Sequence, residues 1–356
     1  MLPARELLLM GWVVLVAGLV LAFANGANDN MKGVATLYGS GSLSYRACLA
    51  VATLSTAVGS LSCVIVAPKL VAAFSAKGLV PDAALTPAFL AAVALAAALT
   101  VLAATWMGLP ISTTHALIGG LVGAGFVAAG PQLALSSLGS VFLLPLLLSP
   151  IASVGLAAGI YLAGRTVRRR TGIEAETGLY IQQTAIAAPA GELRARYVGS
   201  IMGISAHAIV TTAHVASASL VGLARGFNDT PKILGLLVGS AVLTPASGAV
   251  AITVMMGAGG LIASGRVAET LARKITPMNE GQGLAGNFAT SFLVVAASRL
   301  GLPVSTTHVA TGSIFGVGLA ANEARWAAIH PILLAWVATL PLGALLAAIL
   351  ISLPWS

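Results

Sequence analysis

Residues 26–32 read GANDNMK, and residues 226–232 repeat them as GFNDTPK. A second polar motif follows each copy, GLPISTTH at 108–115 and GLPVSTTH at 301–308. The copies are offset by 200 residues for the first motif and by 193 residues for the second. Two different motifs repeated in the same order at nearly constant spacing indicate that the chain is an internal duplication.

The sequence around these motifs is strongly apolar. Of the 356 residues, 58% are hydrophobic and only 8% are charged, whereas about 25% of a soluble domain is charged. Apolar runs of roughly 20 residues, the length that crosses a bilayer, recur along the whole chain. The sequence therefore predicts an all-α polytopic membrane protein, embedded in the lipid bilayer, and excludes a soluble globular one. We expect the first run, residues 7–24, to be a retained helix rather than a signal peptide.

The longest hydrophilic stretch, residues 165–196, contains six arginines and three glutamates. We expect it to be a cytoplasmic linker between a first transmembrane repeat, residues 1–164, and a second, residues 197–356. In the first half the expected crossings are 7–24, 45–67, 87–105, 113–130 and 138–164, with equivalents in the second half. Residues 25–43 and 225–243 are expected to dip into the membrane and return. Five crossings in each half would invert one half relative to the other.

The formal net charge is +8, but the basic residues are thinly spread except near the linker. We expect them to orient the chain in the cell membrane rather than to bind nucleic acid. On the topology above, the side opposite the linker has only a few basic residues: Arg5, Lys69, Lys77, Arg225 and Arg299. This asymmetry predicts a multi-pass protein whose two termini both lie outside the cell.

Each copy of the first motif places one aspartate, Asp29 or Asp229, at membrane depth. An ionised Asp in hydrocarbon costs several kcal/mol, so each is a functional candidate. Asn28 and Asn228 precede them and offer amide oxygens at the same depth. The alternative is a polar cap that only locks a hairpin, with an ion pair between each Asp and the Lys three residues later.

The first motif also has the pattern of a helix start. In the second copy, Thr230 and Pro231 are typical of an N-cap and a first helical residue. This pattern predicts a half-helix that begins at the Asn–Asp pair. Gly26 and Gly226, just before the pair, are expected to let the backbone turn sharply.

The second motif predicts a helix N-terminus after Pro110 and after Pro303, since proline ends the helix before it. Three hydroxyl residues follow each proline: Ser112, Thr113 and Thr114 in the first half, and Ser305, Thr306 and Thr307 in the second. Free N–H groups, the positive end of the helix dipole and small hydroxyls suit a tetrahedral oxyanion. Ordinary Ser/Thr N-caps are the alternative. His115 and His308 come next, and each is more often a packed residue than a proton carrier.

Together the motifs predict one central site where the inverted halves meet. A dianion beside two carboxylates would be repelled unless cations or protons neutralise them. Asp29 and Asp229, with Asn28 and Asn228, are therefore candidate ligands of a coupling cation, either Na⁺ or H⁺; no other cofactor is expected. This arrangement predicts symport of an anion and a cation by alternating access, with the halves rocking around a fixed site.

The four motifs, in order, resemble the duplicated signatures of the inorganic phosphate transporter (PiT) family of sodium- or proton-coupled symporters. The resemblance spans nearly the whole chain. It implies inverted repeats, phosphate binding by the Asn–Asp and Ser-Thr-Thr segments of both halves, and cation sites beside the aspartates. Because the family also includes sulfate permeases, sulfate is the alternative substrate. A homodimer is compatible with the sequence.

The chain departs from the family pattern at Lys32 and Lys232, where the common pattern has a second Asn. Three roles are open for these lysines. Each ammonium could take the place of a coupling cation, pair with its Asp three residues earlier, or reach the membrane surface on its long stem.

A function of another class is a membrane-embedded serine hydrolase with Ser112 or Ser305 as nucleophile. The duplication argues against an enzyme, because a hydrolase needs one such set of residues, whereas alternating access uses two. A passive anion channel is the other alternative, and it would conduct without a cation gradient.

Overall fold

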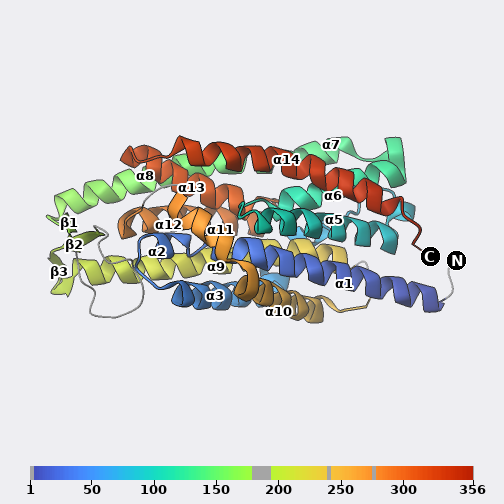
Figure 1. Cartoon of the computed structure of the whole chain (residues 1–356), viewed down its shortest axis with the longest axis horizontal. Coiled ribbons are helices and arrows are strands. Elements are labelled where there is room, and N and C mark those ends of the chain that lie inside the picture. The colour runs from blue at the N-terminus through green and yellow to red at the C-terminus, as the bar shows by residue number, and fades with distance from the viewer. Residues whose placement is uncertain (1–3, 179–193, 239–241, 275–277, 356) are drawn as a thin grey trace.

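The computed structural model describes residues 4–178, 194–238, 242–274 and 278–355. Long helices run side by side along one axis of the molecule (Figure 1). Those of the first half are α1 (Ala4–Asp29), α3 (Tyr45–Val66), α5 (Pro87–Trp106), α6 (Thr113–Ala129) and α8 (Leu144–Arg170). Those of the second half are α9 (Ala206–Val238), α10 (Pro245–Ala263), α12 (Glu280–Leu300), α13 (Thr306–Ala321) and α14 (Trp326–Ile351).

Short helical turns connect the long helices. They are η1 (Asn30–Lys32), α2 (Ala35–Gly39), α4 (Pro68–Ala73), η2 (Asp82–Ala84), η3 (Gly130–Gln132), α7 (Leu135–Ser137), η4 (Leu138–Leu143), α11 (Gly265–Glu269) and η5 (Thr270–Lys274). Several coincide with proline or glycine, which interrupt a helix.

The all-α prediction holds for the long elements, and the described residues between α8 and α9 add two short antiparallel pairs of strands. β1 (Glu174–Gly178) pairs antiparallel with β2 (Arg194–Val198), and β3 (Ser200–Ile201) with β4 (Ile204–Ser205). These strands follow the end of α8, where the apolar run stops, so their backbone groups need not be satisfied within a helix. The linker residues 179–193 lie outside the described part of the chain.

Within the described residues, eight helices are long and apolar enough to cross a membrane. Five of these spans lie in the first half, at Leu9–Lys32, Tyr45–Val66, Pro87–Trp106, Thr113–Gln132 and Leu135–Arg170. Three lie in the second half, at Ala206–Val238, Pro245–Ala263 and Trp326–Ile351. The prediction of a polytopic helical membrane protein is confirmed. α12 and α13 are not among the eight, since α13 has 16 residues and α12 includes the polar residues Glu280, Gln282 and Asn287.

The helices of the two halves interlock. α1 packs against α5 and α10, and its counterpart α9 packs against α12 and α3. α6 packs against α14, as α13 packs against α8. Each of these contacts therefore has an equivalent in the other half, and the first and last helices of each half lie against the other half.

Both chain termini lie at one end of the molecule, and β1, β2 and β3 lie at the opposite end (Figure 1). The first half starts at the terminal end with α1 and reaches the hairpins at the end of α8. The second half starts at the hairpins with α9 and returns with α14.

The predicted break differs between the halves. α1 ends at Asp29 and is followed by η1 and α2, so the helix breaks there. This is five residues after residue 24, the predicted end of the first crossing. The predicted half-helix start at Asn228–Asp229 is wrong, because α9 continues through Pro231 to Val238. The Thr230 hydroxyl donates to Ser60 Oγ at 2.7 Å instead of capping a helix. Proline removes only one backbone hydrogen bond, and a packed membrane helix tolerates that loss.

The prediction that the backbone turns sharply at Gly26 and Gly226 is wrong. Both lie within helices, at the crossings of α1 with α10 and of α9 with α3. A Cβ on Gly26 would lie 2.0 Å from the Met256 carbonyl oxygen, and one on Gly226 would lie 2.4 Å from the Ser60 nitrogen. The glycines are needed because the helix backbones touch at these points.

Candidate functional site

The Ser-Thr-Thr segments form helix N-termini as predicted. α6 starts at Thr113 and α13 at Thr306. The Ser112 hydroxyl accepts a hydrogen bond from the His115 backbone N–H at 3.1 Å. Its equivalent, Ser305, accepts one from the His308 N–H at 3.2 Å. The two serine hydroxyls thus act as N-caps in this structure.

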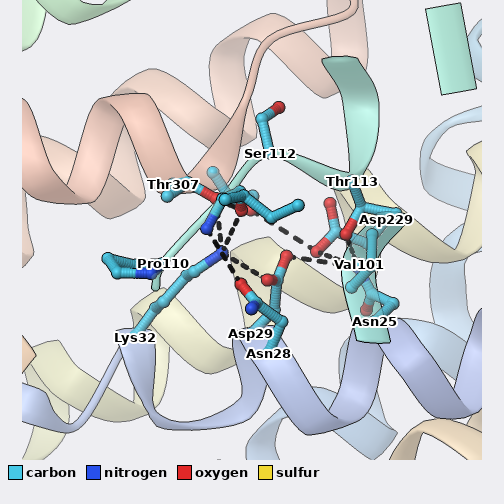
Figure 2. A network of polar contacts seen from close by, with 12 residues as sticks. Asn25, Asn28, Asp29, Lys32, Val101, Pro110, Ser112, Thr113, Asp229 and Thr307 are labelled. Carbon is cyan, nitrogen blue, oxygen red and sulfur yellow. Dashed lines mark hydrogen bonds and ion pairs between the residues drawn. The ribbon is translucent and has the colours of Figure 1, made fainter. Parts of the chain in front are cut away.

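The two predicted carboxylates lie together in the buried centre of the helices (Figure 2). The Asn25 amide nitrogen donates to Asp29 Oδ2 at 3.2 Å and to Asp229 Oδ2 at 3.4 Å. A single amide group therefore bridges the aspartates of the two halves.

The Ser-Thr-Thr helix starts reach the same place. Thr113 Oγ1 accepts from the Asn25 amide at 3.1 Å, and Thr306 Oγ1 donates to Asp229 Oδ2 at 3.5 Å. Thr113 thus contacts the Asn25 amide that bridges the aspartates (Figure 2), and Thr306 contacts the Asp229 carboxylate directly. The structure brings the two motif types of both halves into one site, as the sequence predicted.

Lys32 and Lys232 are buried, with 3% and 1% of their surfaces exposed, so the membrane-surface interpretation is wrong. Lys32 pairs with the Asp29 carboxylate, and Lys232 lies 3.3 Å from Asp229 Oδ1. These are the i,i+3 ion pairs that were one of the open alternatives. A charge in a low-dielectric interior has to be paired, which explains why both stems turn inward.

Arg225 also belongs to the site, although the local sequence does not indicate this and the predicted topology puts Arg225 on the side opposite the linker. The side chain is only 2% exposed. Its Nε lies 3.5 Å from Asp229 Oδ2, and its terminal nitrogens donate to Asn25 Oδ1 at 2.9 Å and Asn30 Oδ1 at 3.0 Å. Asn25 and Arg225 occupy the same repeat position, one residue before the glycine and one helical turn before the Asp. This shared position in the two repeats is the feature of the sequence that could have identified Asn25 and Arg225 as site residues.

The charges of the cluster do not balance. Among the side chains that the structure describes, Arg225, Lys32 and Lys232 face two carboxylates, Asp29 and Asp229. When all five groups are ionised, one net positive charge remains in a buried region, and such a charge favours an anion nearby. Among the described residues, no group of three or more His, Cys, Asp or Glu side chains is placed to hold a metal ion.

Asn28 and Asn228 hold the chain segments around the site. The Asn28 amide donates to Thr105 Oγ1 at 2.9 Å and to the Leu109 carbonyl at 3.0 Å, and its oxygen accepts from the Ile111 N–H at 3.1 Å. In the second half, the Asn228 amide donates to Ser298 Oγ at 3.0 Å. Asn28 therefore ties the end of α1 to the segment that leads into α6.

The two histidines meet across the halves. The rings of His115 and His308 are in edge contact with centroids 4.4 Å apart, and His308 stacks on Trp336 at 3.8 Å. His115 Nδ1 lies 3.2 Å from the Trp336 carbonyl oxygen. Both rings are packed side chains, in line with the simpler of the two sequence interpretations.

Two acidic motifs and two hydroxyl-rich helix starts, drawn from both halves into one buried site, correspond to a known family signature. Residues 25–347 match the sequence profile of the phosphate transporter family. The chain belongs to this family. It is a membrane transporter and not an enzyme, so the serine hydrolase alternative is excluded.

Individual relatives agree with this family membership. The chain is 31% identical over 351 residues to a probable low-affinity inorganic phosphate transporter of Mycobacterium bovis, covering 94% of this chain and 75% of the relative. A relative with the same description in Rhizobium meliloti is 30% identical over 289 residues, covering 76% of each chain.

A solved structure described as the sodium-dependent phosphate transporter superimposes with a TM-score of 0.77. It covers 96% of this chain and 98% of its own, at 20% sequence identity. This similarity shows a shared fold.

Proposed function

We propose that this protein carries inorganic phosphate across the cell membrane by cation-coupled symport, with Na⁺ or H⁺ as the coupling ion. One observation carries the proposal: the helix starts at Thr113 and Thr306 meet the aspartates of both halves in a single buried site, where three basic side chains face two carboxylates. The description of the relatives as inorganic phosphate transporters favours phosphate over sulfate, which remains the second candidate substrate.

The proposed phosphate site lies between the two helix N-termini. Its ligands are the segments Asn28–Asp29, Ser112–Thr114, Asn228–Asp229 and Ser305–Thr307. The positive ends of α6 and α13 and the threonine hydroxyls suit the phosphate oxygens. Asp29 and Asp229, with Asn28 and Asn228, are the proposed ligands of a coupling cation, with Na⁺ or a proton at the carboxylates.

We further propose that residues 1–164 and 197–356 are inverted repeats that rock around this site. The opposite directions of α1 and α9, and of α8 and α14, support the inversion (Figure 1). So does the equivalence of the helix contacts between the halves. Residues 165–196 would form the cytoplasmic linker, because the end of α8 carries Arg168, Arg169 and Arg170.

Uptake into proteoliposomes tests the proposal. Purified protein is reconstituted, and labelled phosphate or labelled sulfate is supplied under an imposed Na⁺ gradient, an imposed H⁺ gradient, or neither. We expect phosphate to accumulate above its equilibrium level only when a gradient is present. Accumulation of sulfate alone would identify the second substrate, and equal flux without any gradient would identify a channel.

The threonine hydroxyls give a sharper test of the anion site. Thr113→Val and Thr306→Val remove one hydroxyl each with little change in shape, and a lost hydrogen bond to a charged group costs about 1.5–3 kcal/mol. We therefore expect the KM for phosphate to rise roughly 10- to 100-fold in each variant. Thr166→Val is the control, because Thr166 is exposed and bonds only to its own helix at Leu162. An unchanged KM in both site variants would show that these hydroxyls only support the helices.

A further inference from the structure

The Lys232 ammonium sits in a cage of oxygen atoms. Thr114 Oγ1 lies 2.6 Å from Nζ, the Val304 carbonyl oxygen 2.8 Å and Asp229 Oδ1 3.3 Å, and the Asn228 amide oxygen is a fourth neighbour. An ammonium has only three N–H donors. Four oxygens around it resemble the shell of a small hard cation, which prefers carboxylate, carbonyl and hydroxyl ligands.

The Lys32 ammonium has an equivalent cage in the first half. It contacts the Asp29 carboxylate and Thr307 Oγ1, and lies 3.1 Å from the Ile111 carbonyl oxygen. The two cages share three ligand types, and these come from equivalent positions of the two halves. They are the aspartate, the third hydroxyl of a Ser-Thr-Thr segment (Thr307 or Thr114), and the carbonyl oxygen of the residue that follows the motif proline (Ile111 or Val304). Each cage takes its hydroxyl from the opposite half.

We infer that Lys32 and Lys232 are tethered cations: each ammonium occupies an oxygen cage that would otherwise take a monovalent cation, so that phosphate transport needs no Na⁺. The inference rests on the proposed phosphate transport and specifies its cation requirement. Both ammoniums are nearly inaccessible to solvent, and each lies between a carboxylate and a threonine of the proposed anion site. A covalently attached charge stays in the site throughout the cycle and is not itself transported, which leaves H⁺, of the two proposed coupling ions, to drive uptake.

The alternative is that the two lysines only stabilise the fold through their ion pairs. A structural ion pair predicts that Lys→Asn lowers stability equally in every salt. A tethered cation predicts instead that the variants respond to the identity of the salt. Once the ammonium is removed, the vacated cage binds Na⁺ but not a large organic cation, so the uptake rate and the Tm are higher in Na⁺. The response to the identity of the cation therefore separates the two roles.

The first experiment measures the initial rate of phosphate uptake in proteoliposomes, with Na⁺ replaced by choline at the same ionic strength and the same pH gradient. We expect wild-type rates in the two media to agree within about twofold. In Lys32→Asn and Lys232→Asn, uptake in choline is expected to fall at least about tenfold below uptake in Na⁺, which corresponds to about 1.4 kcal/mol of stabilisation by the ion. Lys77→Asn, at an exposed position, is the matched control and should behave like wild type.

The second experiment measures the Tm of the detergent-solubilised protein in NaCl and in choline chloride. An ion that binds only the folded protein raises its Tm, so we expect a saturable Na⁺-dependent rise in the two lysine variants and none in wild type or Lys77→Asn. A saturable rise in wild type, or wild-type uptake that requires Na⁺, would overturn the inference even if the variants fail to fold. An absence of uptake under every gradient would refute the proposed function, while the Tm measurements would still decide the role of the lysines.

Discussion

Asp229→Asn is expected to abolish phosphate uptake and to lower the free energy of unfolding by about 3–5 kcal/mol, the usual cost of breaking a buried ion pair. The substitution keeps the shape of the side chain but leaves two buried cations, Arg225 and Lys232, without their carboxylate. Asp29→Asn removes the partner of Lys32 alone, so its loss of stability should be the smaller of the two. The measurements are uptake in proteoliposomes and equilibrium or thermal unfolding in detergent.

A double variant separates the charge effect from the loss of a hydrogen-bonding side chain. Asp29→Asn combined with Lys32→Met removes both charges of one pair, and it should recover much of the stability lost in Asp29→Asn while uptake remains absent. Asp82→Asn is the control, since Asp82 is exposed in η2. Wild-type uptake in either single Asp variant would refute the central site.

Gly26→Ala is expected to reduce both stability and uptake, because a Cβ at residue 26 would lie 2.0 Å from the carbonyl oxygen of Met256 in α10. A backbone atom cannot move aside alone, so α1 and α10 have to separate. Overpacking of this kind costs about 1–3 kcal/mol, and occasionally more. The shift would also displace Asn25 and Asp29, which lie within one turn of Gly26 on α1. Thermal unfolding and uptake measure the two effects.

Gly226→Ala tests the equivalent crossing of α9 with α3 and should have a similar effect, because its Cβ would lie 2.4 Å from the Ser60 nitrogen. Gly155→Ala is the matched control. Gly155 lies within α8 with open space around it, so the added methyl group should be neutral or slightly stabilising through the higher helix propensity of alanine. A neutral result for both Gly26→Ala and Gly226→Ala would contradict the close helix contact.

Much of the architecture could be predicted from local features of the sequence. The five apolar runs of the first half are all found as membrane-length helices. The Ser-Thr-Thr segments start helices because proline ends the preceding helix and a serine caps the next one. The aspartates could be identified as site residues because a carboxylate at membrane depth requires a reason to be there.

The same local signals were wrong where packing outweighs them. Thr230–Pro231 has the pattern of a helix start, yet α9 runs through it, since one missing hydrogen bond is small beside the contacts of α9 with α3, α4 and α12. Glycine before an Asn–Asp pair suggests a turn, but at Gly26 and Gly226 the residue instead allows helix backbones to touch.

The amino-acid sequence alone predicted the membrane helices, the repeated motifs with one aspartate in each half, and the hydroxyl-rich helix starts, because each of these features depends on residues close together in the chain. The tertiary structure was needed to place Arg225 in the centre, to turn both lysines inward and to join Lys32 to Thr307, 275 residues away. The reason is physical. The local sequence shows that a buried charge needs a partner, but which oxygens supply that partner depends on how the helices of the two halves interlock.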